Sequence, residues 1–406
     1  MGMLNVTVVE YFDNTSIENI ATALFYYVDK IIYIGPDEDK INLAINRYNE
    51  LLNDKKKLNI ELVPCIEPSN NLQKIVDVLE KIVAENDEVI FDLEGGKELF
   101  LVAAGMVYAN NKEKVSLHRI DINNNQLINI SNNKVLLKSP HTNISVEENV
   151  KIYGGEIVEK KDKKRFFSSE WEYNKDLIND ILLLWRVYKN HLGDWTEQIK
   201  ELKYLTSSSK NGLLGFDLNK RDVQESSLYS SKLLSDLSAC GAILNFNEDN
   251  RNLTFQYKNK NIKDLLSQEG NILETYVTVC AINSVDDKGE KIFNDARTGI
   301  VISWDEQLRA DVPFVSNEID VALMRGLVPI FISCKCGMVK AEELYKLNSV
   351  AFEFGKKYIK KVLIVASLKF MSDTAYKEFK QRASELDISI IELDETPSLK
   401  NAISNL

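Results

Sequence analysis

Residues 317–337 read NEIDVALMRGLVPIFISCKCG, two apolar stretches that meet at a short turn. This pattern predicts a β-hairpin, and because successive side chains of a strand alternate between faces, Glu318 and Asp320 share one face of the first arm. By the same rule, Ser333 and Lys335 share one face of the second arm. The hairpin therefore carries acids and a lysine at positions where a purely structural strand would carry apolar side chains.

The length of the loop decides which polar residues face each other across the hairpin. With the turn around Arg325 and Gly326, a two-residue loop places Glu318 opposite Ser333, and a four-residue loop places Asp320 there instead. Either register gathers the acids, the serine and the lysine on a single face. The shared face is therefore expected whichever of these two loops the chain adopts.

Carboxylates beside a lysine on neighbouring strands have the chemistry that phosphodiester hydrolysis needs. Alternate residues of a strand lie about 7 Å apart, and Mg²⁺ or Mn²⁺ prefers oxygen ligands. Such a metal orients water and stabilises the transition state, and the Lys335 ammonium adds charge stabilisation. The alternative is a surface ion pair between Asp320 and Lys335. The apolar run around Lys335 favours the metal site, because unpaired charges are costly to bury.

The bulk composition describes a globular protein of two or three domains. The chain has 406 residues, a net charge of −11 and five cysteines without a CxxC motif. The odd cysteine count indicates a reduced, cytoplasmic protein without a disulfide framework, and no apolar run predicts a membrane span. The negative charge argues against a passive nucleic-acid coat but is compatible with an enzyme that has a local basic groove.

Residues 1–140 alternate between buried strands and helices, which predicts a mostly parallel, doubly wound, Rossmann-like α/β sheet. Residues 141–170 are expected to be a connector, and residues 171–265 a mainly helical module that ends in a hairpin. Such a module is typical of a winged helix, but its last helix has few basic residues, which favours a packing or linker role. Residues 266–406 form a second α/β unit.

The stretch FDLEGGKELFLVAAG, residues 91–105, follows a buried strand and opens a helix. Its paired glycines allow close approach of the backbone to a ligand, and a helix N-terminus favours an anion. A second loop after the first strand lies at another helix N-terminus, and ligands of such sheets bind beyond the carboxyl ends of the strands. The candidate ligand-binding residues are Asn14, Thr15, Ser16, Glu94, Gly95, Gly96 and Lys97. A glycine pair at such a turn is equally often structural.

The hairpin with its lysine, preceded by an acid on a helix, resembles the PD-(D/E)xK nuclease fold. In this resemblance Glu274 is the helix glutamate, Asp320 the central aspartate and Lys335 the lysine. Ser333 departs from the pattern, which has an acid two residues before the lysine. The implied catalytic set is Glu274, Glu318, Asp320, Ser333 and Lys335. The implied metal ligands for Mn²⁺ or Mg²⁺ are Glu274, Asp320 and the backbone carbonyl of Cys334, completed by Asp295 or Glu318.

The longer stretches are more specific. NEIDVALMRGLVPIFISCKCG, ELYKLNSVAFEFGKKYIKKVLIV and ISVEENVKIYGG resemble CRISPR-associated ancillary nucleases, which join a CARF (CRISPR-associated Rossmann-fold) sensor to a restriction-endonuclease-like domain. The FDLEGGK loop is similar to the CARF loop, which usually carries Thr or Ser where Glu94 stands. This resemblance implies a homodimer that is activated by a cyclic oligoadenylate, cyclic tetra-adenylate above all. It also implies cleavage of DNA or RNA in type III CRISPR antiviral defence.

Two other functions are compatible with a CARF-like sensor. The first is a ligand-controlled transcription regulator that binds DNA through residues 171–265. The second is a ring nuclease that hydrolyses the cyclic messenger in residues 1–140. Both leave the strand that carries Lys335 unexplained, so the endonuclease is the preferred hypothesis.

Overall fold

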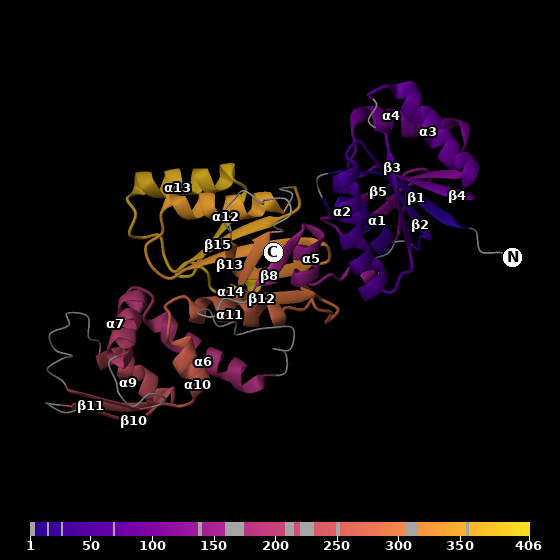
Figure 1. Cartoon of the computed structure of the whole chain (residues 1–406). Helices are drawn as coiled ribbons and strands as arrows, with labels where there is room; N and C mark the ends of the chain where they lie inside the picture. The colour runs from indigo at the N-terminus through magenta and orange to yellow at the C-terminus, as the bar shows by residue number, and fades with distance from the viewer. Residues whose placement is uncertain are drawn as a thin grey trace.

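The computed structural model describes residues 5–13, 16–25, 27–67, 70–136, 140–158, 174–207, 215–219, 231–248, 252–304, 316–354 and 357–406. These residues form two α/β units and a largely helical module (Figure 1). We call them the N-terminal unit (5–136), the middle module (174–266) and the C-terminal unit (140–158 and 267–406). In Figure 1 the N-terminal unit is indigo to purple, and helix α5 lies between it and the C-terminal sheet.

Seven described strands form the sheet of the N-terminal unit, in the order β3-β2-β1-β4-β5-β6-β7. Strands β1 to β5 pair in parallel, and β6 and β7 add antiparallel strands at one edge. Their bounds are β1 Val6–Tyr11, β2 Lys30–Gly35, β3 Glu61–Ile66, β4 Glu88–Asp92, β5 Val115–Asp121, β6 Gln126–Asn129 and β7 Lys134–Leu136. Neighbouring residues such as Val8 and Val9 are both buried, so the predicted mostly parallel sheet with two covered faces is confirmed.

Helices cover both faces of this sheet. They are α1 (Glu18–Phe25), α2 (Glu38–Asn49) with a π-helical continuation (Glu50–Lys55), α3 (Leu72–Glu85) and α4 (Glu98–Asn110). Apolar residues of α1 and α2 pack in one core, and those of α3 and α4 pack in another. Because β1 and β4 are parallel neighbours, the loops that follow them meet at one edge of the sheet. A Cβ at Gly95 would lie 3.4 Å from the side chain of Asp13.

The middle module combines helices with a small sheet of order β10-β11-β9 in its described residues. Its elements are α6 (Lys175–Asn190), α7 (Trp195–Ser207), β9 (Gly215–Asn219), α9 (Ser231–Ala239), β10 (Ile243–Glu248), β11 (Asn252–Tyr257) and α10 (Lys260–Leu265). The expected helices and hairpin are therefore present. Trp185 of α6 stacks on Tyr276 of the C-terminal unit, with ring centroids 3.8 Å apart. One hydrophobic core joins the two parts, so the module packs as part of a larger body.

The C-terminal unit is built on a sheet whose described strands have the order β16-β15-β14-β13-β12-β8. Its elements are α5 (Val146–Ile152), β8 (Gly155–Val158), α11 (Asn271–Ile282), β12 (Asp295–Trp304), β13 (Ser316–Arg325), β14 (Val328–Lys335), α12 (Ala341–Glu353), β15 (Lys360–Val365), α13 (Asp373–Glu385), β16 (Ile388–Glu392) and α14 (Leu399–Ser404). Strand β8 pairs antiparallel with β12. The predicted connector, residues 141–170, therefore contributes a helix and an edge strand to this unit, and its residues 159–170 lie outside the described part.

The decisive hairpin has a two-residue turn, but one residue later than expected. Arg325 pairs with Val328, so the turn consists of Gly326 and Leu327. The expectation that a two-residue loop places Glu318 opposite Ser333 is wrong, because the shift of the turn moves the register. Val321 pairs with Ile332, which puts Asp320 opposite Ser333. The even loop length preserves the shared face.

Gly326 has a positive φ of 61°, and its backbone N–H donates to Asn294 Oδ1 at 2.7 Å. The side chain of Asn125, from the N-terminal unit, lies 2.8 Å from where a Cβ of Gly326 would be. Both the strained turn and this close approach favour glycine at this position. Within the described residues, no helix has both the length and the apolar character needed to span a membrane.

Candidate active site

Asp320 on β13 is held by three groups of the facing strand β14. Its Oδ2 accepts hydrogen bonds from the backbone N–H of Cys334 at 2.8 Å and from the Ser333 hydroxyl at 3.1 Å. Lys335 Nζ lies 3.6 Å from the same oxygen. The structure thus brings Asp320, Ser333 and Lys335 together. Ser333 donates to the carboxylate at the position where the PD-(D/E)xK pattern has an acid.

A second carboxylate, which was not predicted from the sequence, also lies beside the positive charge of Lys335. Glu343, in the first turn of α12, places Oε2 at 3.3 Å from Lys335 Nζ and Oε1 at 2.7 Å from Lys346 Nζ. Burial acts to lower the pKa of Lys335, but Asp320 and Glu343 outweigh it and leave the pKa above its ordinary value. The side chain therefore remains a cation at neutral pH and is suited to charge stabilisation rather than to proton abstraction.

The predicted acids border one cavity of about 910 Å³. Its lining includes Glu274 of α11, Glu318 and Asp320 of β13, and Ser333, Cys334 and Lys335 of β14. The Glu274 carboxylate folds back towards Gly270, where an added Cβ would lie only 2.6 Å from Oε1. Glycine at this position leaves room for the carboxylate. Thus all five residues of the predicted catalytic set face the same space.

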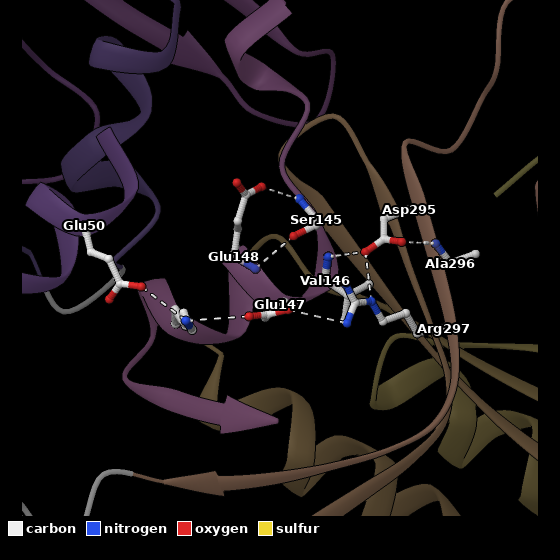
Figure 2. A network of polar contacts seen from close by, with 9 residues as sticks. Glu50, Ser145, Val146, Glu147, Glu148, Asp295, Ala296 and Arg297 are labelled. Atoms are coloured by element: carbon white, nitrogen blue, oxygen red, sulfur yellow. Dashed lines mark hydrogen bonds and ion pairs between the residues drawn. The ribbon is translucent and has the colours of Figure 1, made fainter. Parts of the chain in front are cut away.

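Asp295, one of the two candidates for an extra metal ligand, lies elsewhere (Figure 2). Its Oδ2 accepts from the backbone N–H of Val146 at 2.8 Å and from Arg297 Nε at 3.2 Å, and its Oδ1 accepts from Ala296 N at 2.9 Å. It pairs with Met324 near the hairpin turn, about 13 Å of strand away from Asp320. Asp295 therefore joins α5 to β12 and does not border the cavity.

The remaining donors are oxygen atoms of the kind that a lightly coordinated divalent cation would take. In the described part of the chain, no group of three or more His, Cys, Asp or Glu side chains lies close enough to enclose a metal. Mg²⁺ usually keeps several waters and binds through one or two carboxylates, and the carboxylates that border the cavity include those of Asp320, Glu274 and Glu318. Burial raises the pKa of the Cys334 thiol well above its ordinary value. The sulfur thus stays protonated, and the backbone carbonyl is the donor that Cys334 can offer.

The glycine loop of the N-terminal unit has a backbone conformation that favours glycine at two successive positions. Gly95 and Gly96 have φ values of 81° and 91°, which glycine adopts at little cost. The loop leads directly into α4, and the exposed Lys97 borders a cavity of about 140 Å³ beside the ends of β1 and β2. Ser16 lies just before α1, and its carbonyl accepts from the Tyr48 hydroxyl at 3.3 Å. Asn14 and Thr15 fall outside the described residues.

Glu94 is directed towards the C-terminal unit. Its Oε1 lies 2.5 Å from the Tyr358 hydroxyl and 3.2 Å from Lys357 Nζ. Glu18 of α1 accepts from the same two groups, at 2.5 Å from the Tyr358 hydroxyl and 2.8 Å from Lys357 Nζ. An acid is unexpected in a loop predicted to bind an anion, and these contacts give it a structural role. Composition alone could not have identified them, because the partners are more than 260 residues apart.

Two buried acids lie beneath these loops. Glu10 of β1 is 1% exposed, and neither of its carboxylate oxygens has a hydrogen-bond partner among the described residues. Burial, followed by the charge of Asp92, raises the pKa of Glu10 well above its ordinary value. Burial likewise raises the pKa of Asp92. Both side chains therefore favour the neutral, protonated form.

No protein-family model and no curated protein matches the chain, but solved structures share its fold. Protein VC1899 from Vibrio cholerae has a TM-score of 0.74 and 19% identity, over 98% of this chain and 97% of that chain. Can2 from Sulfobacillus thermosulfidooxidans, solved in complex with cyclic tetra-adenylate, has a TM-score of 0.66 and 14% identity, over 98% of this chain and 95% of that chain. At these identities the likeness establishes a common fold along nearly the whole chain.

Proposed function

We propose that this chain is a metal-dependent endonuclease controlled by a cyclic oligoadenylate that binds the N-terminal unit. The observation that carries the proposal is the convergence of Asp320 and Lys335, 3.6 Å apart, in a cavity that Glu274 and Glu318 also border. The shared fold with Can2, which was solved in complex with cyclic tetra-adenylate, supports this activator. The proposed role in type III CRISPR antiviral defence follows from the resemblance of the sequence to CRISPR-associated ancillary nucleases.

The residues that line the cavity would have different roles in phosphodiester cleavage. A divalent cation held by Asp320 with Glu274 or Glu318 would activate water and offset negative charge at the phosphate. The Cys334 N–H and the Ser333 hydroxyl fix the orientation of the Asp320 carboxylate. The Lys335 ammonium, kept protonated by its acidic neighbours, would donate to a phosphate oxygen whose charge grows in the transition state.

The activator would bind where the two loops of the N-terminal unit meet. Gly95 and Gly96 add no side chains that would cover the backbone, and the N-terminus of α4 together with Lys97 favours a phosphate. The neighbouring loop adds Ser16, with Asn14 and Thr15 as further predicted contacts. A cyclic tetra-adenylate has near two-fold symmetry, which suits a homodimer with an isologous interface.

The proposed signal passes through Glu94 to the C-terminal unit. A phosphate near Gly95 would repel the Glu94 carboxylate and weaken its contacts with Tyr358 and Lys357. A ligand shifts an equilibrium only by its differential affinity for the two states. The activator would bind more weakly to the state in which Glu94 contacts Tyr358 and Lys357, because binding there requires these contacts to break. This gives the required difference in affinity between the two states.

The test is cleavage of single-stranded DNA, RNA and supercoiled plasmid with Mn²⁺ or Mg²⁺, with and without cyclic tetra- or hexa-adenylate. We expect cleavage that requires both the metal and one of the activators. Linear adenylate products without nucleic-acid cleavage would instead support a ring nuclease. Sequence-specific duplex binding without cleavage would support a transcription regulator.

A further inference from the structure

The cavity around Asp320 is bounded by helices from two different parts of the chain. Residues of β13 and β14, of α12 in the C-terminal unit and of α7 in the middle module line it. We call the lining residues of α12 and of α7 its two walls. Thr196, Lys200 and Lys203 of α7 border the cavity. These residues are spaced i, i+4 and i+7, so they form one stripe along the helix.

An adjacent face of α7 fixes this wall in place. Trp195, Ile199 and Leu202 are buried in the core shared with the C-terminal unit. Trp195 Nε1 donates to the carbonyl of Glu269 at 3.0 Å, and the Cys336 thiol donates to the same carbonyl at 3.2 Å. Because Cys336 directly follows β14, the wall is tied to the strand that carries Lys335.

The charges that border the cavity indicate where a polyanionic substrate can bind. Within the described residues, six carboxylates and four ammonium groups line it, so a polyanion needs a defined cationic path. Lys200 and Lys203 supply two cations on the α7 wall, which also carries Glu197. Lys346 supplies one on the α12 wall, where it pairs with Glu343. Lys200 lies 3.9 Å from Glu269 with both side chains exposed, a pairing that costs little to break.

We propose that the middle module is the substrate-binding half of the active site. Lys200 and Lys203 contact the phosphodiester backbone of the nucleic-acid strand as it passes over Asp320 and Lys335. Residues three apart in a helix are about 4.5 Å apart along its axis, which allows two lysine side chains to reach neighbouring phosphates. This inference rests on the proposed nuclease function and assigns the substrate contacts of that site.

The test is nucleic-acid binding by the full chain in which Lys200→Gln and Lys203→Gln are combined. Binding is measured in the Asp320→Asn background, with cyclic tetra-adenylate and Mg²⁺, by the anisotropy of labelled single-stranded and duplex oligonucleotides at several salt concentrations. We expect Kd to rise at least severalfold. Each lost phosphate contact should reduce the slope of log K against log salt by about 0.7–0.9. In the chain with Asp320 intact, KM should rise while kcat changes less than twofold.

The matched control combines Lys260→Gln and Lys263→Gln, which removes two lysines with the same spacing from α10, away from the cavity. Thermal unfolding of both double variants verifies that they fold. If the α7 variant binds with the Kd and salt slope of the α10 variant while the unsubstituted chain cleaves, the inference is wrong and the nuclease proposal stands. If the unsubstituted chain binds but does not cleave, and only the α7 variant loses binding, the nuclease proposal fails and the binding surface stands.

Discussion

The hydroxyl of Tyr358, in the C-terminal unit, lies 2.5 Å from the carboxylate of Glu94 in the glycine loop of the N-terminal unit. Burial, and then the hydrogen bonds to Glu18 and Glu94, raise the pKa of this tyrosine, so the hydroxyl keeps its proton as a donor. The proposed activator site and the unit that carries the proposed active site are therefore connected by a direct polar contact.

Replacing Tyr358 by Phe should raise activator-independent cleavage and tighten activator binding. The substitution removes the hydroxyl that holds Glu94, so the activator no longer has to break this contact. Couplings of this kind change affinity by about fivefold or more. The measurements are the Kd for cyclic tetra-adenylate and the cleavage rate without it. Tyr376→Phe is the control, since it removes a tyrosine–glutamate bond of 3.0 Å to Glu392 within the C-terminal unit. Equal behaviour of the two variants would refute this coupling.

Replacing Glu343 by Gln should lower kcat by about 10–100-fold, as expected when a residue that positions a catalytic group is lost. Glu343 contributes to the raised pKa of Lys335. Its neutralisation should therefore move the alkaline limb of the rate–pH profile to lower pH, because Lys335 then loses its proton earlier. Glu342→Gln, one residue away and outside the cavity lining, should change neither quantity. An unshifted alkaline limb in the Glu343 variant would contradict the positioning role.

Replacing Gly270 by Ala should displace the Glu274 carboxylate without unfolding the protein. The new methyl group would lie 2.6 Å from Oε1, at the end of a flexible side chain that can move away. A displacement of about 1 Å in an active site can cost about 10²-fold in rate. Gly193→Ala is the control, because a Cβ there meets no atom within 4 Å although it borders the same cavity. Equal cleavage rates and equal metal dependence in both variants would show that Glu274 has no part in catalysis.

Replacing Glu10 by Gln should flatten the pH dependence of stability. The pKa of Glu10 is raised in the folded state above its ordinary value of 4.5. The stability that protonated Glu10 contributes to the folded state is therefore fully present below pH 4.5. It is lost as the pH rises through the folded-state pKa. The variant should be more stable than the unsubstituted chain at about pH 8, by several degrees in Tm, and similar to it at about pH 4. Thermal unfolding at the two pH values measures this. An equal Tm difference between the variant and the unsubstituted chain at both pH values would contradict a raised pKa of buried Glu10.

Alternation along strands was sufficient to predict the shared face of the hairpin. Asp320, Ser333 and Lys335 lie together as that rule requires, although the turn begins one residue late. The order of strands and helices from β1 to β5 and from α11 to β16 also follows from apolar periodicity, whereas the contribution of α5 and β8 from the predicted connector does not. These features are local, and they depend on spacings that the chain shows directly.

Contacts between distant segments could not be predicted in the same way. The acidic first turn of α12 is typical of helix stabilisation, so Glu343 gives no sequence signal of its contact with Lys335. Asp295 begins a strand and looked available as a ligand, but the N-terminus of α5 engages it from 149 residues away. The helical pattern of α7 likewise did not indicate that Lys200 and Lys203 face the cavity.

The most direct measurement is the single-turnover cleavage rate of Asp320→Asn and Lys335→Met, with Mn²⁺ and bound cyclic tetra-adenylate. Asp394→Asn and Lys369→Met are matched controls, because Asp394 accepts from Ser367 at 2.7 Å and pairs with Lys369 at 2.9 Å outside the cavity. The account predicts losses of about 10²–10³-fold for the first two variants, unchanged activator binding in all four, and little change in the controls. Cleavage by Asp320→Asn or Lys335→Met at the rate of the unsubstituted chain would contradict it.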